Sequence, residues 1–127
     1  MARRRDGRGR LVVHRHGSEG DGAVLTVPLE ISTSYRARTK GLLGRDALDG
    51  AMLLSPASGV HTFGMRIPID VAYLDRRLTV LAVRTMQPGR LGRPRLRARH
   101  VLEAEAGAMA EWGLDVGVQV TVEADQR

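Results

Sequence analysis

The densest group of polar side chains in the sequence lies in one short stretch. His61, Thr62, Arg66 and Asp70 fall within ten residues of each other. A histidine titrates near neutral pH and can act as a general base, and an arginine can hold an anion. We predict that these four residues line a pocket for a small polar or anionic ligand, without catalysis. Two other interpretations stay open: a hydrolase that uses His61 and Asp70, and a structural role in which Asp70 accepts backbone hydrogen bonds.

A second group of charged residues is expected to be partly buried. Arg45, Asp70 and Glu103 each lie beside large apolar residues in the sequence. Because a buried charge needs a partner, we predict an ion pair between Arg45 and either Asp70 or Glu103. Such a pair would clamp a helix onto a sheet.

The positive charge of the chain is concentrated near the N-terminus, in residues 1–10, and in an internal segment, residues 84–99. The formal net charge is +6, and residues 84–99 contain six arginines and no acid. This segment predicts an alternative function, the binding of a polyanion such as nucleic acid through phosphate contacts. The residues involved would be Arg90, Arg93, Arg95, Arg97 and Arg99. The segment contains no aromatic residue on which a base could stack, and arginine-biased codon usage explains the excess equally well.

Residue types and spacings that would hold a metal or a cofactor are sparse. The sequence has no cysteine, which excludes disulfides and thiolate sites. His14 and His16 with Glu19 form the one metal-like spacing, and its flanking residues match no known pattern, so we predict neither metal nor cofactor. Nucleophile elbows and glycine-rich phosphate loops are also absent from the sequence.

Length and hydropathy indicate one domain that lies in the cytoplasm. The chain has 127 residues, and no apolar run approaches the ~20 residues of a membrane helix. Residues 1–10 contain five arginines and no large apolar residue after Met1, so we predict a disordered tail there and a single β-rich domain over residues 11–127.

Short alternating apolar runs between glycines and prolines predict the elements that position these residues. We expect helices over Tyr35–Leu43 and Ala106–Trp112, and a long exposed loop over Gln87–Arg99. The predicted fold is mainly β, a compact antiparallel barrel or sandwich of about seven short strands with two short helices. Candidate strands are Leu11–His16, Ala23–Ile31, Ala51–Leu54, Gly59–Phe63, Ile69–Leu74, Leu78–Thr85, His100–Glu105 and Val116–Glu123.

Four stretches in a fixed order resemble a known family. They are Gly41-Leu42-Leu43-Gly44-Arg45, Ala51-Met52-Leu53-Leu54, Ile67-Pro68-Ile69-Asp70, and Val101-Leu102-Glu103 followed by Ala106-Gly107 and Gly117. Together they resemble the bacterial and archaeal family called domain of unknown function 192, over roughly residues 23–123. The resemblance implies a compact, mainly antiparallel β fold and no assigned activity.

The chain also departs from the pattern of that family, near its end, where members often have Gly-Asp and this chain has Gly117-Val118, and in one longer stretch. Most members carry Trp-Met-Lys-Asn-Thr just before an Ile-Pro-Leu-Asp stretch. Here the corresponding segment reads His61-Thr62-Phe63-Gly64-Met65. The departure coincides with the polar group from which we predict a ligand pocket.

Overall fold

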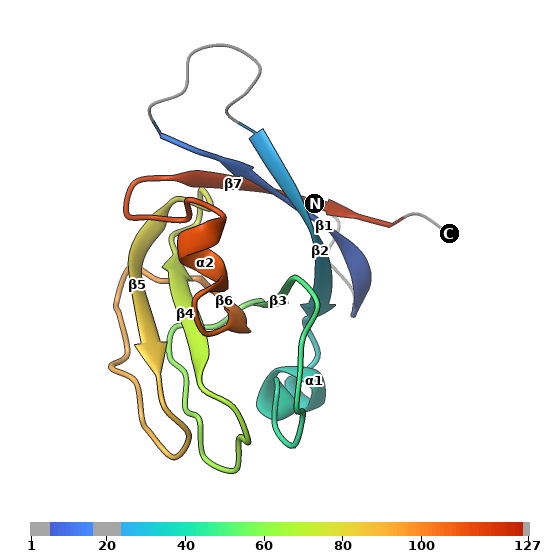
Figure 1. Ribbon diagram of the computed structural model, residues 1–127, viewed down its shortest axis with the longest axis vertical. Helices are drawn as coiled ribbons and strands as arrows, with labels where there is room; N and C mark the ends of the chain where they lie inside the picture. The colour runs from blue at the N-terminus through green and yellow to red at the C-terminus, as the bar shows by residue number, and fades with distance from the viewer. Residues whose placement is uncertain (1–5, 17–23, 126–127) are drawn as a thin grey trace.

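Seven strands hydrogen-bond into a single curled sheet, with two short helices packed beside it. The computed structural model describes residues 6–16 and 24–125. The sheet order is β5-β4-β6-β3-β2-β1-β7, and only the neighbours β2 and β3 run parallel. The elements are β1 (Gly7–His14), β2 (Val24–Ser32), α1 (Tyr35–Lys40), β3 (Ala51–Leu54), β4 (Ile69–Leu74), β5 (Val80–Met86), β6 (His100–Glu105), α2 (Ala108–Glu111) and β7 (Gln119–Ala124) (Figure 1).

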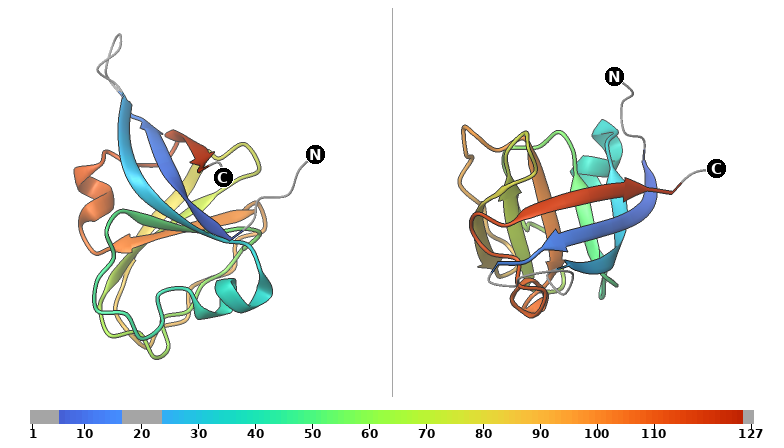
Figure 2. Two further views of the ribbon diagram at one scale, coloured as in Figure 1. Left: turned by 90° about the vertical axis from the view of Figure 1, so that its right-hand side faces the viewer. Right: turned by 90° about the horizontal axis from the view of Figure 1, so that it is seen from above.

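The sheet bends so strongly that its two edges approach each other. Figure 2 shows β1 and β7, in blue and red, running across the direction of β4 and β5. Thr79, just before β5, forms an isolated antiparallel bridge with Gln119 at the start of β7. The result is a half-barrel, which confirms the predicted mainly-β class with seven strands and two short helices. No helix in the described part of the chain is long and apolar enough to cross a membrane.

The three central strands are buried on both faces. All residues of β3 and β4 are buried, as are the four inner residues of β6. Successive side chains of a strand point to opposite faces, so these strands serve two separate cores. One core contains Leu29, Ala51, Leu53, Leu102, Ala104 and Met109 of α2. The other contains Leu42, Met52, Leu54, Met65, Val71 and Val101.

The strand register assigns the two buried carboxyl groups to opposite cores. Glu103 pairs with Met52 on β3 and with Val71 on β4, which belong to the second core. Asp70 pairs with Ala104 on β6, which belongs to the first core. Because directly paired residues share a face, Glu103 and Asp70 face away from each other.

The N-terminal boundary of the fold differs from the prediction. Strand β1 begins at Gly7, and Gly9 and Arg10 pair with both β2 and β7. A β-carbon on Gly9 would lie within 2.2 Å of the Glu123 carbonyl oxygen, so a glycine is required there. The segment joins the sheet through its backbone, and its lack of apolar side chains therefore misled the prediction. Residues 1–5 lie outside the described residues.

Several predicted elements are present with shifted ends, and one is not a strand. Helix α1 ends at Lys40 and α2 covers only Ala108–Glu111. Of the predicted strand Gly59–Phe63, only His61 forms a bridge, with Leu91. The stretch that connects the first two strands, residues 17–23, lies outside the described residues.

Asp6 anchors the start of α1, and this predicts a measurable loss when its charge is removed. Its carboxylate accepts hydrogen bonds from the backbone N–H and the hydroxyl of both Thr33 and Ser34. The Ser34 hydroxyl bond is the largest of the contributions that lower the Asp6 pKa. We expect Asp6→Asn to lower the free energy of unfolding by roughly 1 kcal/mol at neutral pH, measured by urea denaturation. The exposed Asp49→Asn is the control, and equal stability of both variants would contradict the anchor.

A lowered pKa also fixes the direction of the pH dependence at Asp6. Its contribution to stability is fully present above the pKa of the unfolded chain and is lost as the pH falls toward the lower folded value. The difference in stability between wild type and Asp6→Asn should therefore shrink in acid.

Candidate functional site

The structure does not bring the four predicted ligand residues together. Thr62 is fully buried, and its Oγ1 donates to the Gln87 carbonyl at 2.6 Å and accepts from Arg90 N at 2.8 Å. Arg66 is exposed and reaches the equally exposed Asp46 at 3.4 Å. Among the four, only His61 borders the cleft described below. Thr62 holds a loop in place, and Arg66 belongs to the surface.

Asp70 has a structural environment. It is 3% exposed and accepts hydrogen bonds from the Thr85 hydroxyl at 2.7 Å, Gly107 N at 2.9 Å and Met109 N at 3.1 Å. These bonds tie β4 to β5 and to the start of α2. The geometry matches the interpretation in which Asp70 accepts backbone hydrogen bonds, and it places Asp70 and His61 at different hollows. The hydrolase alternative therefore has no shared site in this structure.

Arg45 pairs with a residue that the sequence analysis did not consider. Its two Nη atoms donate to the two carboxylate oxygens of Glu30, each at 2.9 Å. This bidentate bond lowers the pKa of Glu30 and raises that of Arg45. The predicted pair of Arg45 with Asp70 or Glu103 is wrong, because β3 lies between β2 and β6 and brings Glu30 within reach instead.

Glu103 is therefore a buried carboxyl group with no counterion among residues 6–16 and 24–125. It is 1% exposed, and its Oε1 has no hydrogen-bond partner among the described residues. Gly41, at the end of α1, lies directly over it: a β-carbon there would be 3.2 Å from Glu103 Oε1. Burial raises the pKa of Glu103 to about 7. A carboxyl with this pKa carries a proton on about half of the molecules near neutral pH and can then donate as well as accept a hydrogen bond.

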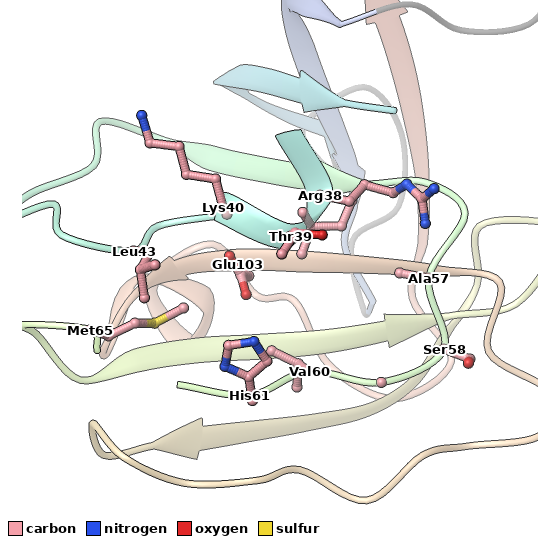
Figure 3. Close-up of a pocket in the computed structure, with 13 residues that line it drawn as sticks. Arg38, Thr39, Lys40, Leu43, Ala57, Ser58, Val60, His61, Met65 and Glu103 are labelled. Atoms are coloured by element: carbon pink, nitrogen blue, oxygen red, sulfur yellow. The ribbon is translucent and has the colours of Figure 1, made fainter. Parts of the chain in front are cut away.

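Glu103 lies at the floor of a cleft of about 280 Å³. In Figure 3 its side chain lies between Thr39 of α1 and the pair Val60 and His61. The lining residues come from α1 and the loop after it, from β3 and the segment after it, and from β6. They are Arg38, Thr39, Lys40, Gly41, Leu43, Leu54, Ala57, Ser58, Gly59, Val60, His61, Met65 and Glu103.

The polar groups at the cleft differ in how firmly they are held. Arg38 donates from Nε to the Thr33 carbonyl at 3.1 Å and from Nη1 to the Pro56 carbonyl at 3.0 Å, so its guanidinium is fixed. His61 stacks on Phe63 with the ring centroids 5.2 Å apart. The ammonium group of the exposed Lys40 makes no hydrogen bond or ion pair with the residues described. Arg38 and Lys40 place two positive charges at the rim of the cleft, and in Figure 3 both side chains extend away from Glu103.

Sequence reasoning missed Arg38 and Lys40 as site residues. Both lie on the last turn of α1, directly before the first of the four family-like stretches, and this position in the sequence could have pointed to them. Gly41, Leu54 and Glu103 each belong to one of those stretches, and all three border the cleft.

The five loop arginines of the polyanion prediction do not gather at one place. Arg95 lies over the Tyr73 ring, 4.8 Å from its centroid, and is half-buried. Arg90 and Arg93 are exposed, and Arg97 and Arg99 border a different hollow. Polyanion binding by the whole set stays a prediction.

The two histidines of the metal-like spacing are engaged separately. His14 Nε2 lies 2.9 Å from Thr121 Oγ1, and His16 Nε2 lies 3.1 Å from the Val116 carbonyl oxygen. Glu19 lies outside the described residues.

The fold and the cleft define a small half-barrel β domain in which a buried carboxyl group with one oxygen unpaired among the described residues lies beneath a basic rim. The sequence profile of the DUF192 family, described as "Uncharacterized ACR, COG1430", matches residues 17–122. The chain belongs to this family, which confirms the resemblance seen in the four stretches.

Curated relatives and solved structures agree with the assignment. A UPF0127 protein of Pyrococcus horikoshii is 30% identical over 84 residues, covering 62% of this chain and 73% of the relative. A UPF0127 protein of Pyrococcus abyssi is 29% identical over 97 residues, covering 72% of this chain and 83% of the relative.

Two crystal structures share the fold. One, from Sinorhizobium meliloti 1021, is described as a "putative transcription regulator" and superposes with a TM-score of 0.78 at 17% identity, covering 95% of this chain and 98% of that one. A protein of unknown function from Novosphingobium aromaticivorans gives 0.71 at 19% identity, covering 88% and 83%. At these identities the likeness shows the fold alone.

The buried Glu103 predicts an unusual dependence of stability on pH. Because its pKa is about 7 in the folded protein against 4.5 as the ordinary value, the folded state keeps a proton that the unfolded state loses first. Its contribution to stability is fully present below about pH 4.5 and is lost as the pH rises through 7. A shift of this size corresponds to roughly 3 kcal/mol.

Glu103→Gln tests this dependence, because an amide does not titrate. The variant should be more stable than wild type at pH 8, and this advantage should shrink toward pH 4.5, measured by urea unfolding. The exposed Glu111→Gln, on α2, should follow wild type at every pH. A constant difference between Glu103→Gln and wild type across this range would show that the carboxyl group has its ordinary pKa.

Proposed function

We propose that this domain binds a small polar ligand with an anionic group in the cleft above Glu103, without chemical conversion. The observation that carries the proposal is the unpartnered Oε1 of a carboxyl group that is 1% exposed and borders a ligand-sized cleft. Buried polar atoms are almost always paired, and an unpaired one costs about 1–3 kcal/mol. A donor on a ligand would supply the missing hydrogen bond.

The lining of the cleft defines the chemistry of the ligand. Glu103 requires a hydrogen-bond donor such as a hydroxyl, amide or ammonium group. Arg38 and Lys40 at the rim favour a carboxylate or another anion. The side chains of Leu54, Val60 and Met65 supply apolar walls for a short hydrocarbon body. The cavity volume of about 280 Å³ lies near the lower end of small-molecule sites, which favours a hydroxy or amino carboxylate over a larger molecule.

Family membership supports this location. Three of the four stretches through which the chain resembles its family meet at the cleft, from parts of the sequence as far apart as Gly41 and Glu103. Each is placed there by a different element: the end of α1, β3 and β6. The names of the relatives assign no activity, so the proposal stands on the geometry of the cleft.

Amide chemical shifts can test the proposal directly. We expect titration with a panel of lactate, serine and N-acetylglycine to shift the amide signals of Gly41, Ser58 and Gly59 saturably with at least one compound. Gly107 and Gly113, at the separate hollow beside Asp70, should not move. Glu103→Leu should weaken binding about tenfold or more, because the buried hydrogen bond is lost.

Glu111→Leu, which adds the same side chain at an exposed position on α2, serves as the matched control and should bind as wild type does. Glu103→Leu should remain folded, since an apolar residue suits the core around position 103. Wild-type affinity in Glu103→Leu, or no cleft shifts with any member of the panel, would refute the proposed site.

Lys40 tests the anionic part of the ligand. We expect Lys40→Gln to weaken binding of a carboxylate that occupies the cleft by about two- to fivefold at low salt, and less at high salt, because the charge is exposed and screened. The neutral amide of the same compound should bind both proteins equally. Arg36→Gln, on the same helix but outside the cleft lining, is the control with the same change in charge. An equal loss in both variants would indicate general electrostatic attraction in place of a rim contact.

A further inference from the structure

Four arginines from two distant segments surround a second hollow of about 360 Å³. Arg76 and Arg77 lie in the turn between β4 and β5, and Arg97 and Arg99 lie in the segment before β6. Asp75 and Leu96 complete the lining, and Leu96 is 97% exposed. Sequence reasoning grouped the loop arginines by proximity along the chain and left out the two in the turn.

The backbone on both sides of the hollow is held by hydrogen bonds. Asp75 Oδ1 accepts from Arg77 N at 2.8 Å and from Thr79 N at 3.0 Å, which fixes the turn. Arg99 N donates to the Leu74 carbonyl at 2.8 Å, and the residue before it, Ala98, is 1% exposed. The arginines therefore extend from fixed positions, which reduces the conformational entropy lost when they close on a ligand.

The positive charge at the hollow exceeds the negative charge of its lining, with four arginines against the single acid Asp75. Ion pairs in the described part of the chain join Arg10, Arg45 and Arg66 to their acids, and none involves an arginine of the hollow. Asp75 is the one acid in the lining, and its Oδ1 is already bonded to two backbone N–H groups. Arg99 Nη1 donates to the Leu96 and Ala98 carbonyls, which orients its guanidinium.

We propose that this hollow binds an oligophosphate group through its phosphates alone. One guanidinium group can bind two phosphate oxygens at once. Four arginines around one concavity therefore match a ligand with several clustered negative charges. No aromatic residue lines the hollow, so nothing there stacks on a nucleobase. Tripolyphosphate, ATP and GTP are therefore expected to bind with affinities within a few-fold of each other. The site is separate from the cleft at Glu103 and does not depend on the function proposed there.

Isothermal titration calorimetry with tripolyphosphate tests the site, using the full chain at ~50 mM salt. The double variant Arg76→Gln and Arg97→Gln should lose about tenfold or more in affinity. The matched control is Arg90→Gln and Arg93→Gln, which removes the same charge from exposed arginines of the same loop outside the hollow. The control should stay within about threefold of wild type, since only screened long-range attraction changes. Thermal melts should show both variants folded.

Three results would overturn the proposal. The first is no measurable binding of tripolyphosphate by wild type at ~50 mM salt. The second is an equal loss in the two double variants, which would show diffuse attraction to a basic surface. The third is an affinity for duplex DNA more than about tenfold higher, per binding site, than the affinity for tripolyphosphate. In that case both double variants should also reduce the slope of log affinity for DNA against log salt concentration, as expected for a nucleic-acid surface.

A lipid headgroup could present the same phosphate chemistry, and Leu96 distinguishes the two sources. If free oligophosphate is the ligand, Leu96→Ser should leave tripolyphosphate affinity unchanged, and vesicles of phosphatidylcholine with phosphatidylserine should not bind the protein. Vesicle binding that depends on Leu96 together with weak tripolyphosphate binding would assign the hollow to a membrane surface instead.

Discussion

Burial on both faces of the central strands is the constraint on which the rest of the structure depends. Strands β3, β4 and β6 each supply side chains to two cores, so their sequences are apolar almost throughout. Asp70 and Glu103 are the charged residues at fully buried positions of these strands, since Glu105 lies at the half-buried end of β6, and the register places the two on opposite faces. Asp70 receives three donors there, whereas Glu103 Oε1 receives none from the described residues. A buried acid whose hydrogen bonds the fold does not complete stabilises the protein poorly, and this supports the proposal that Glu103 acts at the cleft above it.

Local pattern was sufficient to predict most elements and the fold class, because apolar alternation and turn residues act over a few positions. The order of strands in the sheet is not encoded in this way. Arg45 pairs with Glu30, on β2, because β3 inserts between β2 and β6. Because local patterns do not reveal strand order, the prediction that these polar residues share one pocket also failed. His61, Thr62 and Asp70 are close along the chain, yet one borders the cleft, one is enclosed by a loop and one faces the other core.

Composition led to a wrong prediction where a segment is held in the sheet by backbone hydrogen bonds and not by buried side chains. The segment from Gly7 to Arg10 has no apolar side chain to bury, but it pairs on both sides, and Gly9 permits the close approach to β7. The segment before β6 was correctly expected to lack regular structure over most of its length. The fully buried Thr62 nevertheless bonds to Gln87 and Arg90 in it, and Ser58 accepts from Arg95 N. An arginine-rich loop that is held in this way can present its guanidinium groups at defined positions.

The cleft combines a floor and a wall with different physical origins. Gly41, Leu54 and Glu103 form the floor from family-like stretches, and the register of the sheet together with the positive φ of Gly41 fixes their places. The wall includes His61 and Met65, from the segment between β3 and β4. A substitution in the floor has to satisfy the packing of a core, whereas a substitution at the exposed His61 does not. Under the proposed function, substitutions in the wall of this chain can therefore alter ligand preference while the buried carboxyl group stays in place.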